Sequence, residues 1–180
     1  MTVIDAGTGS ASGASRAGGR HRAREVALQV LYAIDLGAEP SSQRDESGAD
    51  DEDAIGSGVV GKERDPVASC GRAFDRIVKH FDVPASAAGF ARDLATAVAG
   101  RRDEIDALIG LHARNWRVSR MAAVDRNVLR LAVHELQQTP TPVAVVIDEA
   151  VDLARRFGSE GSPAFVNGVL DAVAREVRAA

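Results

Sequence analysis

Apolar residues recur along most of this chain at the three- and four-residue spacing of an α-helix. In the segment 20–36 one such stripe consists of Ala23, Val26, Ala27, Val30, Leu31 and Ile34. Gly37 follows the stripe, and glycine is common just beyond a helix end. The same spacing predicts helices over about 67–81, 86–100, 101–113, 121–138, 143–157 and 163–177. No segment shows the alternation of a half-buried strand, so the pattern predicts an all-α fold, a compact bundle of about seven helices.

Proline and glycine mark several of the predicted helix ends. Thr141 before Pro142, and Ser162 before Pro163, are each predicted to cap a helix whose first residue is the proline. Gly168 instead interrupts the apolar pattern of the last helix, where glycine costs about 1 kcal/mol relative to alanine. We expect close packing against another backbone at Gly168.

Composition favours one globular domain. The chain has 180 residues with 45% hydrophobic content, enough for a single core. The only cysteine, Cys70, cannot form an internal disulfide, and neither it nor the four scattered histidines have metal-ligand spacing. No run of about 20 apolar residues and no signal-peptide core occurs. We expect a cytoplasmic protein that binds no membrane, metal or cofactor.

Two segments are predicted to be disordered. The N-terminal tail, 1–19, is rich in Gly, Ser and Ala, and residues 37–66 hold nine acidic but only three basic residues. Both have too few large apolar residues to offset the entropy of ordering them. The folded domain is therefore expected over 20–180, with an acidic insertion over 37–66. A solvated loop is the favoured interpretation of the insertion, and an intramolecular competitor for a basic site is the alternative.

Basic residues gather at the predicted start of the first helix. Arg20, His21, Arg22 and Arg24 lie within five positions. Free N–H groups at a helix start bind phosphate, and guanidinium groups add two-pronged phosphate contacts. These residues indicate a nucleic-acid contact, and a solvated basic face is the alternative.

Aromatic rings can stack on unpaired RNA bases. Tyr32 lies on the basic helix, and Phe165 lies in the first turn of the last helix. Trp116 is a third candidate, although it is more easily explained as a plug at a helix junction. A place in the core is the alternative for each ring.

No catalytic site is predicted. HExxH, CxxC and GxxxxGK[ST] patterns are absent from the sequence. Asp148, Glu149 and Asp152 form an acidic group on one predicted helix, opposite its apolar face. We interpret them as a solvent face, suited to the positive end of the helix dipole.

Four stretches, in order, resemble the NusB family: RHRAREVALQVLY at 20–32, VDRNVLRLAVHEL at 124–136, DEA at 148–150 and FVNGVL at 165–170. The similarity spans about 20–175. It implies two packed helical subdomains and a non-catalytic role in transcription antitermination. The implied partners are boxA-type single-stranded RNA of ribosomal RNA transcripts, the small-subunit ribosomal protein NusE, and the RNA polymerase antitermination complex.

The resemblance also implies roles for individual residues. RNA contacts fall on Arg20, His21, Arg22, Arg24, Tyr32, Ser162 and Phe165. The NusE contact falls on Asp125 and Arg130. Three features depart from the family pattern: His21 stands where arginine is frequent, Gly161 stands where an acidic residue is frequent, and the acidic insertion is long.

Other readings of the resemblance remain. Some family members form homodimers that cover the RNA surface. NusB-like domains are also fused to ribosomal RNA cytosine methyltransferases, but no glycine-rich cofactor segment occurs here, so we expect no enzyme. A helical protein–protein adaptor without sequence-specific RNA binding is the main alternative, and it would be indifferent to Arg22 and Arg24.

Overall fold

The computed structural model describes residues 10–37, 65–80, 83–113 and 116–179. Within these ranges it contains seven α-helices, a single 3-10 turn and no strand. The α-helices are α1 (Ser10–Asp35), α2 (Pro66–His80), α3 (Ala85–Gly100), α4 (Arg102–His112), α5 (Ala123–Gln138), α6 (Val143–Phe157) and α7 (Ser162–Ala179). The 3-10 turn, η1, covers Val118–Arg120. The prediction of an all-α fold is confirmed.

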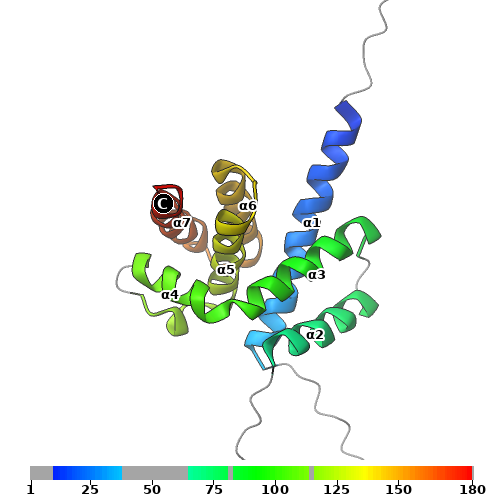
Figure 1. The fold of residues 1–180 in the computed structure, drawn as a ribbon, viewed down its shortest axis with the longest axis horizontal. Helices are drawn as coiled ribbons and strands as arrows, with labels where there is room; N and C mark the ends of the chain where they lie inside the picture. The colour runs from blue at the N-terminus through cyan, green and yellow to red at the C-terminus, as the bar shows by residue number, and fades with distance from the viewer. Residues whose placement is uncertain (1–9, 38–64, 81–82, 114–115, 180) are drawn as a thin grey trace, which may run out of the picture.

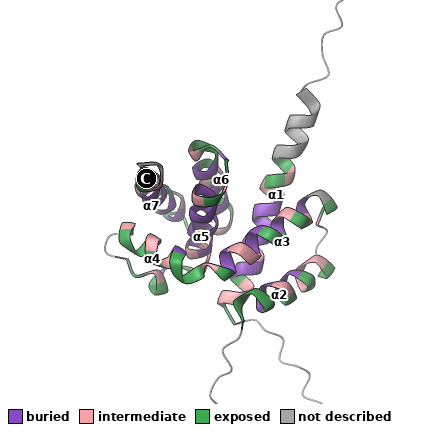
Figure 2. Cartoon of the chain, in the orientation of Figure 1, coloured by how far each residue is buried: buried purple, intermediate pink, exposed green. Residues whose placement is uncertain are grey.

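The helices form two packed groups (Figure 1). Helices α1, α2 and α3 pack on one another, and α4, α5, α6 and α7 form the second group. Helix α5 lies at the centre: it contacts α4, α6 and α7 in its own group, and α1 and α3 in the other. Figure 2 shows buried residues along α5 and along the inner part of α1. The interface between the groups is therefore part of one continuous core.

Helix α1 begins earlier than predicted. It starts at Ser10 and not at Arg20, because a helix that packing has already nucleated can extend through the preceding Gly-, Ser- and Ala-rich residues. Arg20 consequently lies inside the helix, where backbone N–H groups are already bonded. The prediction that free N–H groups there bind phosphate is wrong. The rest of the expected tail, residues 1–9, lies outside the described residues.

Glycine ends two helices as predicted. Gly37 has φ of 65°, and its N–H donates to the carbonyl of Ile34. Gly158 follows α6, and its N–H donates to the carbonyl of Ala154. Most of the expected insertion, residues 38–64, lies outside the described residues. Among the described helices, none has the length and apolarity needed to cross a membrane.

Three local predictions differ from the structure. The Ser162 hydroxyl accepts a hydrogen bond from the Ser159 N–H, at 2.9 Å, and so holds the preceding turn instead of capping α7. Helix α6 begins at Val143 with Pro142 at its N-cap position, so the proline precedes the first helical residue instead of being it. At Gly168 an added Cβ would meet no atom within 4 Å, so close backbone packing does not explain this glycine.

Candidate nucleic-acid interface

A buried carboxylate organises the basic residues of α1. The Glu25 side chain is only 2% exposed, and it accepts a 2.6 Å hydrogen bond from Arg22. His21 lies 3.4 Å from the same carboxylate, and Arg156 of α6 also donates to it. The Arg156 side chain remains 58% exposed. Glu25 therefore fixes cationic groups from two helices on one surface.

His21 joins α1 to α6 as well. Its Nδ1 lies 2.7 Å from Oε2 of Glu149, so this carboxylate lies at the contact between α1 and α6 and not on a free solvent face. Arg20 is exposed, with its guanidinium 5.7 Å from the centre of the Phe90 ring on α3. We call Arg20, His21, Arg22 and Arg156 the basic cluster.

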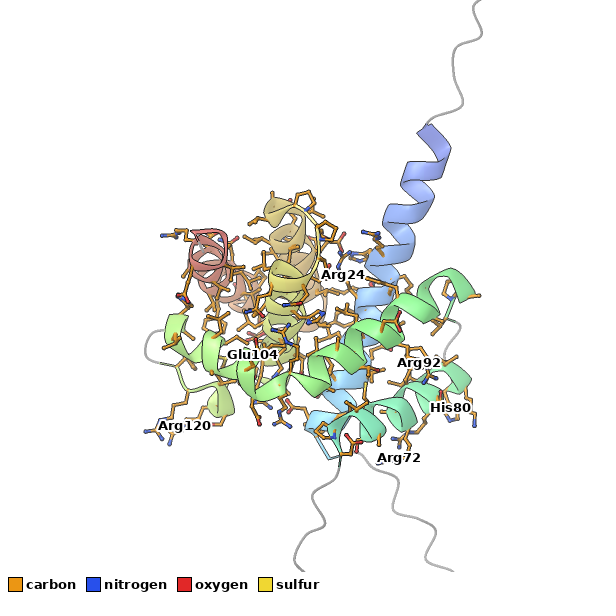
Figure 3. The ribbon with its side chains drawn as sticks, in the orientation of Figure 1. Arg24, Arg72, His80, Arg92, Glu104 and Arg120 are labelled. Atoms are coloured by element: carbon orange, nitrogen blue, oxygen red, sulfur yellow. The ribbon has the colours of Figure 1, made fainter. Side chains whose placement is uncertain are left out.

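Arg24 does not belong to this surface. It is 4% exposed, and its guanidinium donates two hydrogen bonds of 2.7 Å to the two oxygens of Glu135 on α5. Burial alone would lower the pKa of Arg24, but the carboxylates of Glu135 and Glu149 raise it above its ordinary value. Figure 3 shows Arg24 between α1 and α5. The structure thus contradicts a direct RNA contact by Arg24, because the side chain already has its partners inside the protein.

Arg130, expected at the partner surface, is also buried. It is 3% exposed and donates two hydrogen bonds of 2.7 Å to Asp106. It also lies 3.3 Å from Asp35, which Arg126 contacts at 2.5 Å. Burial lowers and the two carboxylates raise the pKa of Arg130, with a net rise. The expectation that Arg130 contacts a partner is therefore contradicted: this arginine joins α1, α4 and α5.

Tyr32 is apart from the basic cluster. It is 38% exposed and lies ten residues after Arg22 on α1, about 15 Å along the helix. The structure therefore leaves its ring available but does not bring it to the cluster.

The structure brings three predicted site residues together in a pocket elsewhere. A cavity of about 220 Å³ is lined by Trp116, Met121, Ala122, Asp125, Ser159, Gly161, Ser162 and Phe165. The Trp116 and Phe165 rings are 5.7 Å apart at an angle of 59°. Trp116 is 56% exposed, so it does not plug a helix junction. We call this cavity the Trp116 pocket.

Asp125 gives the pocket a polar wall. The residue is 8% exposed, and its Oδ1 is buried with no hydrogen-bond partner among the described residues. A desolvated carboxylate oxygen without a donor costs about 1–3 kcal/mol or more. The pocket lining thus includes two aromatic rings and the mostly buried Asp125, whose Oδ1 itself is closed to solvent.

The basic cluster and the Trp116 pocket are linked through α6. Arg156 lies in the last turn of α6, and Ser159 of the pocket follows three residues later. Three residues of extended chain span at most about 11 Å. The backbones of Arg156 and Ser159 are therefore within about 11 Å of each other.

Sequence reasoning missed Arg156 and Glu149. Both lie more than 100 positions from their partners on α1, so no local motif connects them. The described residues contain no group of three or more side chains arranged to hold a metal ion.

Comparison with known proteins agrees with this architecture. The family model described as "NusB family" matches residues 21–175. A transcription antitermination protein NusB of Anaeromyxobacter dehalogenans is 45% identical over 156 residues, covering 86% of this chain and 89% of that protein. The protein with the same description from Myxococcus xanthus is 40% identical, covering 87% and 95%.

Solved structures show the same fold. NusB of T. maritima superposes with a TM-score of 0.63 at 28% identity, covering 87% of this chain and 91% of that one. A structure of antitermination factors NusB and NusE in complex with dsRNA gives a TM-score of 0.65 at 27% identity, covering 88% and 97%. With a family model over most of its length and relatives above 40% identity, the chain belongs to the NusB family.

Proposed function

We propose that this protein is a non-catalytic, cytoplasmic transcription antitermination factor that binds boxA-type RNA together with NusE. The observation that carries the proposal is the basic cluster, in which Glu25 fixes Arg22 and Arg156 from two helices on one surface. The relatives described as antitermination proteins, and the structural neighbour that holds NusE and RNA, support it.

Charge and geometry suggest how RNA is held. Arg20, Arg22 and Arg156 would contact phosphates, with His21 beside them. Phe165, beyond the α6–α7 turn, would stack on a base. Because guanidinium groups held in place lose less entropy on binding, the fixed positions of Arg22 and Arg156 favour RNA binding.

Arg24 has a different role in this proposal. Its buried hydrogen bonds to Glu135 fix the position of α1 along α5. Arg24 would therefore support the RNA surface without contacting RNA. Arg130 supports the other end of α1 in the same way through Asp35. Asp125 and Tyr32 stay candidates for the surface shared with NusE and RNA.

The proposed complex is a ternary clamp in which NusE tightens RNA binding. By thermodynamic linkage, RNA must then tighten NusE binding by the same factor. The test is to titrate a fluorescent boxA-type RNA and a scrambled RNA, with and without NusE, at two salt concentrations. We expect selective binding that NusE strengthens.

Two variants separate the clamp from a helical adaptor. Arg22→Ala should weaken RNA binding several-fold, while Arg175→Ala, an exposed arginine on α7, should leave it unchanged. Equal affinity for both RNAs, unaffected by NusE, would leave the adaptor as the better account.

A further inference from the structure

We propose that Arg126 is a positioning residue for RNA binding: it orients the connection between α4 and α5 so that Arg117 and Arg120 on that connection meet phosphates. The inference rests on the proposed function and adds to it basic residues outside the basic cluster. Its basis is a set of hydrogen bonds that join the Arg126 side chain to the end of α1 and to the connection.

Most of the donors of the Arg126 guanidinium bond within the protein. Its Nε donates to Oδ2 of Asp35, the last residue of α1, at 2.8 Å, and its Nη2 donates to the same oxygen. Its Nη1 donates to the carbonyls of Val118 and Met121, at 3.3 and 3.0 Å. The side chain is only 14% exposed. Arg126 is therefore placed to orient other groups and not to contact RNA itself.

The two carbonyls lie at the two ends of η1. Val118 begins this turn and Met121 follows its last residue. The Val118 side chain packs against the core and Met121 is buried, which fixes the depth of the turn. Apolar contacts have no preferred direction, whereas a hydrogen bond depends on its angle. The hydrogen bonds from Arg126 therefore fix the orientation of η1 relative to α1 and α5.

The turn carries two exposed cations. Arg117 precedes η1 and Arg120 ends it, and neither pairs with a carboxylate in the part of the chain that the structure describes. Figure 3 shows Arg120 extending away from the helices. Cations of this kind attract a phosphate backbone, and they lose less entropy on binding when their backbone is already held in place. The orientation of η1 thus sets how well these two arginines meet RNA.

Arg126→Lys separates positioning from charge. Lysine keeps a cation beside Asp35, but one ammonium group cannot bond to a carboxylate and two carbonyls as the planar guanidinium does. Arg102→Lys is the matched control, because Arg102 also faces Asp35, at 3.7 Å, and makes no hydrogen bond to η1 among the described residues. Arg126→Lys should weaken the binding of a fluorescent boxA-type RNA about threefold to tenfold. Arg102→Lys should leave the affinity unchanged.

A double-mutant cycle tests whether Arg126 acts through the two exposed arginines. Arg126→Lys is repeated in a protein that carries Arg117→Ala and Arg120→Ala, where it should cause no further loss of RNA affinity. Trp116, the single tryptophan, precedes Arg117 and reports on the connection. Its fluorescence anisotropy should fall in Arg126→Lys and stay unchanged in Arg102→Lys. Circular dichroism at the temperature of the titrations confirms that each variant is folded.

Three results would overturn the inference while the proposed function stands. Equal losses from Arg126→Lys in both backgrounds would mean that the substitution does not act through the two arginines. An RNA affinity unchanged by Arg126→Lys, or by Arg117→Ala with Arg120→Ala, would mean that η1 does not contribute to RNA binding. A loss of NusE binding alone would make η1 a protein contact. If the wild-type protein binds no boxA-type RNA, with or without NusE, the inference and the proposed function both fall.

Discussion

Arg24 and Glu135 form a two-pronged ion pair of 2.7 Å between α1 and α5, and both side chains are almost completely buried. Neither charge can reach water when its partner is lost. Removing one partner of a buried pair costs about 3–5 kcal/mol, whereas replacing both by apolar side chains is often neutral or stabilising.

We therefore predict that Arg24→Met lowers the free energy of unfolding by about 3–5 kcal/mol. Arg24→Met combined with Glu135→Leu should recover most of this loss, since no unpaired charge remains at Glu135. Urea denaturation of both variants measures the difference. A double variant no more stable than Arg24→Met would show that the loss does not come from an unpaired charge at Glu135.

Arg156 should matter for RNA as much as Arg22 does. Arg156→Ala is expected to weaken binding several-fold and to reduce the slope of log affinity against log salt by about 0.7, the value for one contact to single-stranded nucleic acid. Its neighbour Arg155, exposed and paired with Asp152, is the matched control. Similar losses for Arg155→Ala and Arg156→Ala would indicate a general charge effect.

The lowered pKa of Asp35 predicts that the protein loses stability in acid. Burial alone raises its pKa, but the hydrogen bond from Arg126 and the charge of Arg130 outweigh burial, so the pKa lies below its ordinary value of 3.8. The stabilisation is complete above pH 3.8 and disappears as the pH falls through the lower folded-state pKa. Thermal melts between pH 2 and 5 should show this loss, and Asp35→Asn should flatten that part of the curve. An unchanged slope in Asp35→Asn would assign the acid limb to other groups.

His134 should affect the stability of the protein at a higher pH than Asp35 does. Burial and the nearby Arg101 lower its pKa below the ordinary 6.5, so the folded protein keeps the ring neutral. As the pH falls, the unfolded chain therefore takes up a proton on His134 before the folded protein does. The free energy of unfolding should decline as the pH falls below 6.5. Melting temperatures of wild type and His134→Gln between pH 5 and 8 test this, and parallel curves would contradict it.

Gly168 should be replaceable. The site is exposed, lies inside α7 and has room for a Cβ, so Gly168→Ala should stabilise the protein by about 0.5–1 kcal/mol. Gly158→Ala is the opposite case, because its Cβ would lie 2.6 Å from the Ser162 side chain. In thermal denaturation, the melting temperature should rise for Gly168→Ala and fall for Gly158→Ala. A destabilised Gly168→Ala would contradict the prediction.

The sequence predicted the helices well where periodicity and helix breakers coincide. Helix α6 has the predicted bounds, Val143–Phe157, because a proline precedes it and a glycine follows it. The start of α1 was missed because Gly- and Ser-rich composition concealed ten further helical residues. For such a segment, local propensity is a weaker determinant than extension of a helix that packing has already nucleated.

The candidate site was predictable only in part. A cluster of arginines signals charge, but burial decides which of them face solvent. Arg22 and Arg24 are two positions apart, yet one lies at the surface and the other bonds to Glu135 in the core. The joining of Asp125 with Phe165 in one pocket depends on the packing of α5 against α7, which no local pattern encodes.

The ion pairs of α1 also set an order of events during synthesis. Glu135, the partner of Arg24, follows it by 111 positions in the sequence. Arg126, a partner of Asp35, follows Asp35 by 91 positions. While the ribosome is still making α2, α3 and α4, these α1 charges have no place to be buried. Helix α1 can complete these ion pairs only after α5 has emerged, so the first three helices lack these charge partners until that point of synthesis.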